Sequence, residues 1–250
     1  MANVVFSPEW FYNIDMFLSL IGIVIALILG AYTYQIYGFL REKKYKYFSY
    51  AFFAIAAGSL IRLIMNSSVY FYLFHKSSPE IIGTITAFAL SKDVITLIGF
   101  FAGHFLTLLG FMTIFFISHD FSSRKLYLLM AYLIAIAAWF SNKIFFSYHL
   151  TSAVILLGIF VKYYQNFKIT GNKLVVIAFG LFTIAEVSFL FLAKSQLAFV
   201  IGELIYVFAF IFLLLNFLMI KMGNKKKNIE RIEIRKSSKN KGKKIGKKKK

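Results

Sequence analysis

The sequence predicts an all-α membrane protein, a bundle of seven transmembrane helices with its N-terminus outside and its C-terminus cytoplasmic. First, the 250 residues are 60% hydrophobic and 19% aromatic, which is more apolar surface than a soluble core of this size can bury. Second, the apolar residues form seven long segments between short polar connections. Third, the formal net charge of +19 is uneven, because residues 221–250 hold 15 Lys and Arg against two Glu.

The first predicted span opens with a helix-start signal. Ser7-Pro8-Glu9 supplies a hydroxyl for the N-cap, a proline for the first helical position and an acid for the first turn. No Lys or Arg precedes this span, so we expect an uncleaved segment and not a signal peptide. Small residues at helical spacing would let another helix approach closely: Ser19, Gly22, Ala26 and Gly30.

The remaining elements follow from similar signals. Ser78-Pro79-Glu80 repeats the helix start before an apolar stretch too short to cross a bilayer, which we interpret as an interfacial helix at about 79–90. Ser91 and Asp93 then restart a helix. We predict a transmembrane domain over residues 1–220, with spans at about 11–37, 47–74, 92–118, 123–141, 144–164, 173–193 and 196–220.

Orientation follows from the basic residues, which are retained on the cytoplasmic side. The connections after the first, third and fifth spans carry 4, 2 and 3 Lys and Arg, whereas those after the second, fourth and sixth carry 2, 1 and 1. Sliding the last three spans onto the first three aligns Gly30 with Gly158 and Phe39 with Phe167. This alignment fits a 3+1+3 arrangement of parallel repeats with the fourth span as connector, or a chance match between apolar helices.

Ionisable residues inside the spans mark the candidate site. Arg62 lies in the second span and cannot lose its proton, so it needs water or carboxylates. Glu186, Glu203 and His104 lie at comparable depth, and Asn66 shares a helix face with Arg62. We expect these residues to converge in a partly hydrated pocket in the outer half, or to form an ion-pair network that only fixes helix register.

Three further residues are weaker candidates. Asp15 and Asp93 lie near predicted helix starts, where the helix dipole alone stabilises a carboxylate. His149 is a lone intramembrane histidine, which is commonly a satisfied hydrogen-bonding residue. We predict no catalytic or metal site, because the chain has no Cys and no pair of His one helical turn apart. No cofactor is expected.

Residues 221–250 are predicted to form a disordered, polybasic cytoplasmic tail. Besides the lipid bilayer itself, we expect the tail to attract anionic lipid headgroups, by about 1 kcal/mol per basic residue near the surface. A solvated topology anchor without a specific partner is the alternative. Specific nucleic-acid binding is not expected, since no aromatic residue lies between the lysines to stack on bases.

The SPEW opening, the basic first connection and the seven-span layout together resemble two groups of proteins. These are uncharacterised archaeal seven-span membrane proteins and the seven-span sensory regions that precede some prokaryotic histidine kinases. The resemblance covers residues 1–220 and implies a sensory or receptor-like module. No output domain follows Ile220, so signalling would pass through a separate cytoplasmic partner.

Other seven-span families fit less well. Microbial rhodopsins need a retinal-binding lysine in the last span, and residues 196–220 contain none. Small sugar transporters of the SWEET and PQ-loop type carry prolines in their helices, whereas Pro8 and Pro79 lie outside the predicted spans. A small transporter, proton-coupled through Glu186 or Glu203, and a structural or assembly protein remain the alternatives to a sensor.

Overall fold

The computed structural model describes residues 7–8, 10–74, 82–121, 123–141, 145–170, 173–191 and 195–219. Side chains are described for these residues except 68–74, 82–96, 145 and 168–170. The described residues form seven helices and no strand. They are α1 (Tyr12–Leu40), α2 (Lys43–Phe74), α3 (Ile82–Ser118), α4 (Arg124–Phe140), α5 (Phe145–Thr170), α6 (Lys173–Leu190) and a C-terminal helix (Gln196–Met219).

Six of these helices are long and apolar enough to cross a membrane, all except α4. The chain is therefore a multi-pass helical membrane protein, as the composition predicted. With 17 residues, α4 is the shortest of the seven helices. It starts with a side-chain cap, because Ser123 Oγ accepts a hydrogen bond from the backbone N–H of Leu126 at 3.4 Å.

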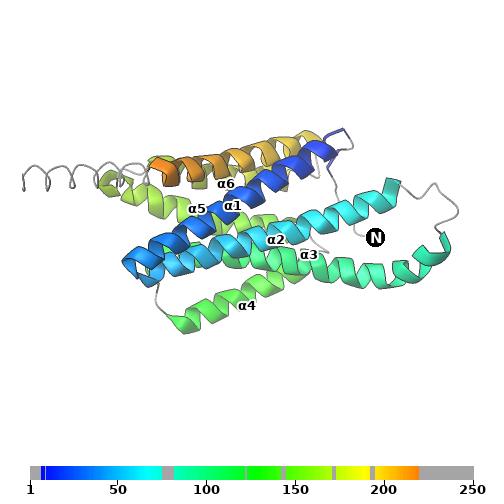
Figure 1. The fold of residues 1–250 in the computed structure, drawn as a ribbon, viewed down its shortest axis with the longest axis horizontal. Helices are drawn as coiled ribbons and strands as arrows, with labels where there is room; N and C mark the ends of the chain where they lie inside the picture. Colours follow the sequence, from blue (N-terminus) through cyan, green and yellow to red (C-terminus); the bar gives the residue numbers. More distant parts are fainter. Residues whose placement is uncertain are drawn as a thin grey trace, which may run out of the picture.

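The helices pack in chain order around the bundle (Figure 1). Neighbouring pairs α1–α2, α2–α3, α3–α5 and α5–α6 are in contact. The C-terminal helix closes the ring, because the ring of Phe210 lies 4.9 Å from that of Phe182 on α6 and also packs against Gly22 of α1. Helix α4 contacts only α3 and α5 and lies at the edge of the bundle.

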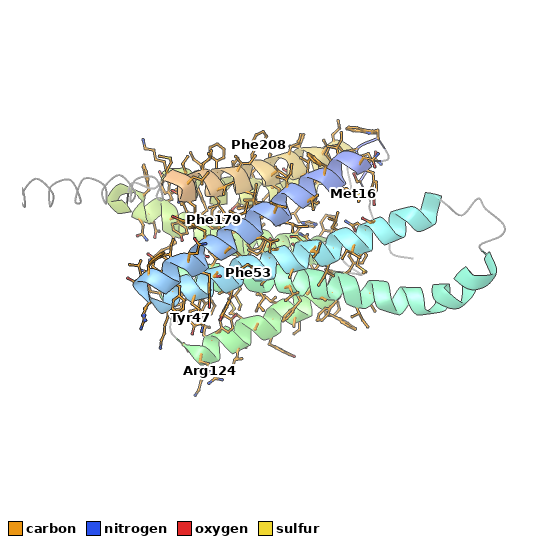
Figure 2. All side chains as sticks on the ribbon, viewed as in Figure 1. Met16, Tyr47, Phe53, Arg124, Phe179 and Phe208 are labelled. Atoms are coloured by element: carbon orange, nitrogen blue, oxygen red, sulfur yellow. The ribbon has the colours of Figure 1, made fainter. Side chains whose placement is uncertain are left out.

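The labelled residues identify the two ends of the bundle (Figure 2). Met16 marks the end where α1 begins, which we call the N-terminal end, and Tyr47 and Arg124 mark the opposite end. At the opposite end α1 and α2 are joined by only two residues, and Arg41 adopts a left-handed conformation with φ of 53°. Nearby, the Ser49 hydroxyl of α2 donates to the carbonyl of Gly30 on α1 at 2.8 Å.

The structure differs from the sequence-based interpretation at two helix starts. Helix α1 begins at Tyr12 and not at Ser7, after a turn in which Phe11 N–H donates to the carbonyl of Pro8 at 2.9 Å. Both Pro8 and Phe11 are buried, so packing overrides the local start signal.

The second difference concerns α3, which is one helix of 37 residues where we predicted an interfacial helix and a separate span. A serine and an aspartate are weak helix breakers without a proline or glycine beside them, so Ser91 and Asp93 lie within a continuous helix. The predicted start at Ser78-Pro79-Glu80 and the tail at 221–250 lie outside the described residues. The interfacial position of residues 79–90 stays a prediction.

Candidate functional site

Arg62 lies at a point where α2 and α3 approach closely. A Cβ added at Gly103 of α3 would lie 2.7 Å from Cγ of Arg62, and one added at Gly58 would lie 2.6 Å from the Gly103 carbonyl oxygen. Glycine at both positions therefore allows the two backbones to approach, as small residues commonly do between membrane helices. The aliphatic part of Arg62 passes over Gly103, and the guanidinium extends toward α5.

The guanidinium of Arg62 has few partners for a charged group. Its Nη2 donates to Ser59 Oγ at 3.3 Å, and its Cζ lies 5.4 Å from the ring centroid of Tyr148. Its Nε is buried and has no hydrogen-bond partner in the described structure. None of the described carboxylates forms an ion pair with Arg62.

Glu186 pairs with a residue that we had placed among the weaker candidates. His149 Nδ1 lies 2.7 Å from Glu186 Oε2, and the glutamate is 1% exposed. The His149 ring also packs against Phe189 of α6, with centroids 4.9 Å apart. Among the described residues, Glu186 therefore forms its ion pair with His149 of α5 and not with Arg62.

Tyr148 connects Arg62 with His104. The His104 ring stacks on the Tyr148 ring at a centroid distance of 4.2 Å, on α3 and α5 respectively. His104 Nδ1 lies 2.7 Å from the hydroxyl of Ser141 at the end of α4. The Tyr148 hydroxyl lies near Thr107, but it makes no hydrogen bond of good geometry among the described residues.

Glu203 and Asp15 complete the group of charges. Glu203 interacts electrostatically with Asp15, Arg62 and Glu186, although the described residues contain no ion pair to it. It precedes Tyr206 by three residues on the C-terminal helix, so both lie on one helix face. The Tyr206 ring packs 4.9 Å from Phe182 of α6, which places this face toward the interior. Asp15 is buried on α1 and also interacts with Arg62.

We call this group the polar cluster: Asp15, Arg62, His104, Tyr148, His149, Glu186, Glu203 and Tyr206. It draws on six helices. It includes six of the eight candidates that the sequence indicated, all except Asn66 and Asp93, and it adds Tyr148 and Tyr206. Asn66 lies one turn from Arg62 on α2 and has no described side-chain hydrogen bond. Asp93 is in α3, but its side chain lies outside the described part of the chain.

Aromatic and aliphatic layers lie on both sides of the polar cluster. Toward the N-terminal end, Phe11 packs edge-on against Phe199 at 6.5 Å, and Phe199 contacts Phe189 at 5.7 Å. Toward the opposite end, beyond the buried polar side chains of Thr107 and Ser152, the helices form an apolar core. This apolar core includes Phe111, Leu156, Ile159, Phe182, Phe210 and Leu213.

The cluster contains no arrangement typical of a metal centre. Within the described residues, no three His, Asp or Glu side chains are placed to hold a metal ion. What the geometry offers is a set of charges of both signs, close enough to interact but mostly not in contact, together with several hydroxyl groups. Such a group of residues can belong to a polar binding site or to a network that only holds the helices in register.

No protein-family model, curated protein or solved structure matches this chain. Function therefore has to be argued from the polar cluster itself, because a helical bundle alone does not specify one.

Proposed function

We propose that this chain crosses the cytoplasmic membrane seven times, with its N-terminus outside and its C-terminus inside. In this proposal α4, the fourth helix of the chain, crosses the membrane in addition to the six longer helices. At about 1.5 Å per residue, the 17 residues of α4 span roughly 25 Å, close to the minimum for crossing a bilayer. The excess of Lys and Arg in alternate connections supports this orientation. The peripheral position of α4 between two three-helix halves supports the 3+1+3 arrangement.

In this orientation the polar cluster lies in the outer half, and we propose that it binds a small ligand in a sensor or receptor-like module. The observation that carries the proposal is Arg62, a guanidinium with a buried Nε that has no hydrogen-bond partner among the described residues and no ion pair there. An uncompensated charge or donor inside a bundle costs free energy. A purely structural network would pair these groups, whereas a binding site leaves them for the ligand.

The apolar core favours a sensor over a transporter. A transported ion or solute must pass from the polar cluster to the cytoplasmic side, and Phe182, 1% exposed, lies one turn below Glu186 on that route. Phe111 and Phe210 pack beside it, at ring distances of 6.2 and 4.9 Å. A ligand that contacts helices from both halves of the bundle would alter the packing of these helices. It would thereby transmit a signal without itself crossing the membrane. The output would pass to a separate cytoplasmic partner, with the basic tail held near anionic headgroups.

Accessibility of the cluster from outside tests this function. The chain contains no cysteine, so single cysteines can be introduced without removing any native thiol. We expect Ser59→Cys, beside Arg62, to react with a small charged thiol reagent added to the outer face of intact cells. Ser49→Cys is the matched control, because Ser49 lies on the same helix, is fully buried and is near the opposite end. Equal, negligible labelling of both variants would overturn an outward-open site and favour a structural role.

A further inference from the structure

The polar cluster carries its positive and negative groups on different helices. The positive group, Arg62, comes from α2, whereas Glu186 and Glu203 come from α6 and the C-terminal helix. Asp15 is on α1, where this helix meets the C-terminal helix. Glu186 already interacts with His149, because His149 Nδ1 lies 2.7 Å from Glu186 Oε2. Arg62 on one side and Glu203 with Asp15 on the other therefore remain without an ion pair among the described residues.

Several buried hydrogen-bonding groups on different helices lack a partner among the described residues. Arg62 Nε, Tyr206 Oη and the hydroxyls of Tyr148 and Ser152 are buried without a hydrogen-bond partner among the described residues. Tyr148 and Ser152 are at most 1% exposed, so bulk water does not satisfy them. These atoms come from α2, α5 and the C-terminal helix, so a ligand that satisfied all of them would contact three helices.

The signs of the charges restrict the chemistry of such a ligand. A simple anion would be attracted by Arg62 but would face the carboxylates of Glu203 and Asp15, and a simple cation would face Arg62. A neutral ligand would leave both charges uncompensated. A molecule with one group of each sign can place its carboxylate against the guanidinium and its ammonium against the carboxylates.

We infer that the ligand of the polar cluster is a small zwitterion that carries a carboxylate and an ammonium group and bridges Arg62 to Glu203. This inference rests on the proposed outward-facing ligand site. The apolar part of the ligand would contact the rings of Tyr148 and Phe199, which lie beside the charged groups. Bridging the two halves would also explain how such a ligand changes their packing.

The test uses the full-length chain in nanodiscs of uncharged lipid and a matched set of probes. The probes are glycine, β-alanine and 4-aminobutyrate, with acetate, propionate and butyrate as acids that lack the amine, and ethylamine, propylamine and butylamine as amines that lack the carboxylate. Binding is measured by calorimetry and by the shift in thermal unfolding temperature. We expect at least one zwitterion to bind more than tenfold more tightly than the acid and the amine of similar length.

Variants that remove one charge should then each abolish one part of the preference for the zwitterion. Arg62→Gln should abolish the advantage of the zwitterion over the amine, and the nearly isosteric Glu203→Gln should abolish its advantage over the acid. Arg124→Gln and Glu42→Gln are the controls, since both residues are exposed at the opposite end. If Arg62→Gln does not fold, the result with Glu203→Gln still decides.

The outcomes separate this inference from the proposed function. If Ser59→Cys is labelled from outside but the acid or the amine binds as tightly as every zwitterion, or no zwitterion binds, the inference fails and the outward-facing site survives. If Ser59→Cys is not labelled and no probe of any class binds, both fail. A zwitterion preference that neither Arg62→Gln nor Glu203→Gln alters would also overturn the inference.

Discussion

Two interfaces in corresponding places of the two halves are built from opposite kinds of residue. Between α2 and α3, glycine meets glycine, and an added Cβ at Gly58 would lie 2.5 Å from Thr107 Oγ1 and 2.6 Å from the Gly103 carbonyl oxygen. Between α6 and the C-terminal helix, rings meet rings, with Phe182 packed at 4.9 Å against both Tyr206 and Phe210. The first interface is backbone against backbone, and the second is side chain against side chain.

This difference explains how one bundle holds charges of opposite sign near one another without pairing them. Gly103 leaves room for the stem of Arg62 where α2 and α3 approach, so the guanidinium extends past Gly103 to the ring of Tyr148. Between the other two helices, bulky rings fill the space below Glu186 and Glu203. The interface of α2 with α3 therefore positions the positive Arg62. The interface of α6 with the C-terminal helix positions the negative Glu186 and Glu203.

The largest effect is expected from Phe182→Ala. Phe182 is 1% exposed and contacts rings on three helices, so its loss leaves a cavity that lipid cannot fill. We expect a loss of about 3 kcal/mol in the free energy of unfolding, at the low end for such substitutions because the separated helices stay in lipid. Reversible unfolding in mixed detergent micelles measures it.

Phe208→Ala provides the matched control for that prediction. Phe208 is on the C-terminal helix and is 55% exposed on the outside of the bundle (Figure 2). Its truncation should change the unfolding free energy by less than about 0.5 kcal/mol. Similar losses in the two variants would show that the rings do not form the interface described above.

A smaller loss is expected at the glycine interface. Gly58→Ala adds a methyl group against backbone atoms that cannot rotate away, and we expect a loss of about 1–3 kcal/mol. Gly38→Ala is the control, because an added Cβ there meets nothing within 4 Å. The alanine should leave that variant unchanged or slightly more stable, since alanine favours helix. If both variants behave alike, close backbone approach is not what holds α2 against α3.

The sequence predicted some of this arrangement and missed the rest for identifiable reasons. Segment length and hydropathy are local properties, so the positions of the helices and of Arg62 within α2 could be read directly. The partner of Glu186 could not, because it depends on how α5 and α6 are rotated about their axes.

One missed signal was present in the sequence. Gly99, Gly103 and Gly110 recur at helical spacing on α3, and each lies against α2, with Met65, Arg62 and Ile55 as the respective neighbours. This stripe is the glycine interface. The stripe that we did single out, on α1, receives aromatic rings in place of a helix backbone, since Phe210 packs on Gly22 and Phe53 on Gly30.

A third prediction tests whether Glu186 interacts with His149 or with Arg62. In a double-mutant cycle, His149→Phe and Glu186→Gln should show a coupling energy of about 1 kcal/mol, because polar contacts between membrane helices contribute modestly. The same cycle with Arg62→Gln and Glu186→Gln should give a clearly smaller value, since these side chains are not in contact. A larger coupling energy for Arg62 with Glu186 than for His149 with Glu186 would mean that Arg62 is the partner of Glu186 and that the charges are paired.

The smallest effect is expected where a glycine faces a ring. A Cβ added at Gly22 would lie 3.4 Å from the edge of the Phe210 ring, and that ring can shift by the few tenths of an ångström required. The helix gains from alanine by up to about 1 kcal/mol, so Gly22→Ala should be neutral or slightly stabilising in the same unfolding assay. A loss as large as that of Gly58→Ala would mean that α1 and the C-terminal helix also need backbone contact. The contrast between rigid glycine packing in one half and adaptable ring packing in the other would then no longer hold. A neutral result would support the interpretation that the Phe210 ring adapts to an added methyl group on α1.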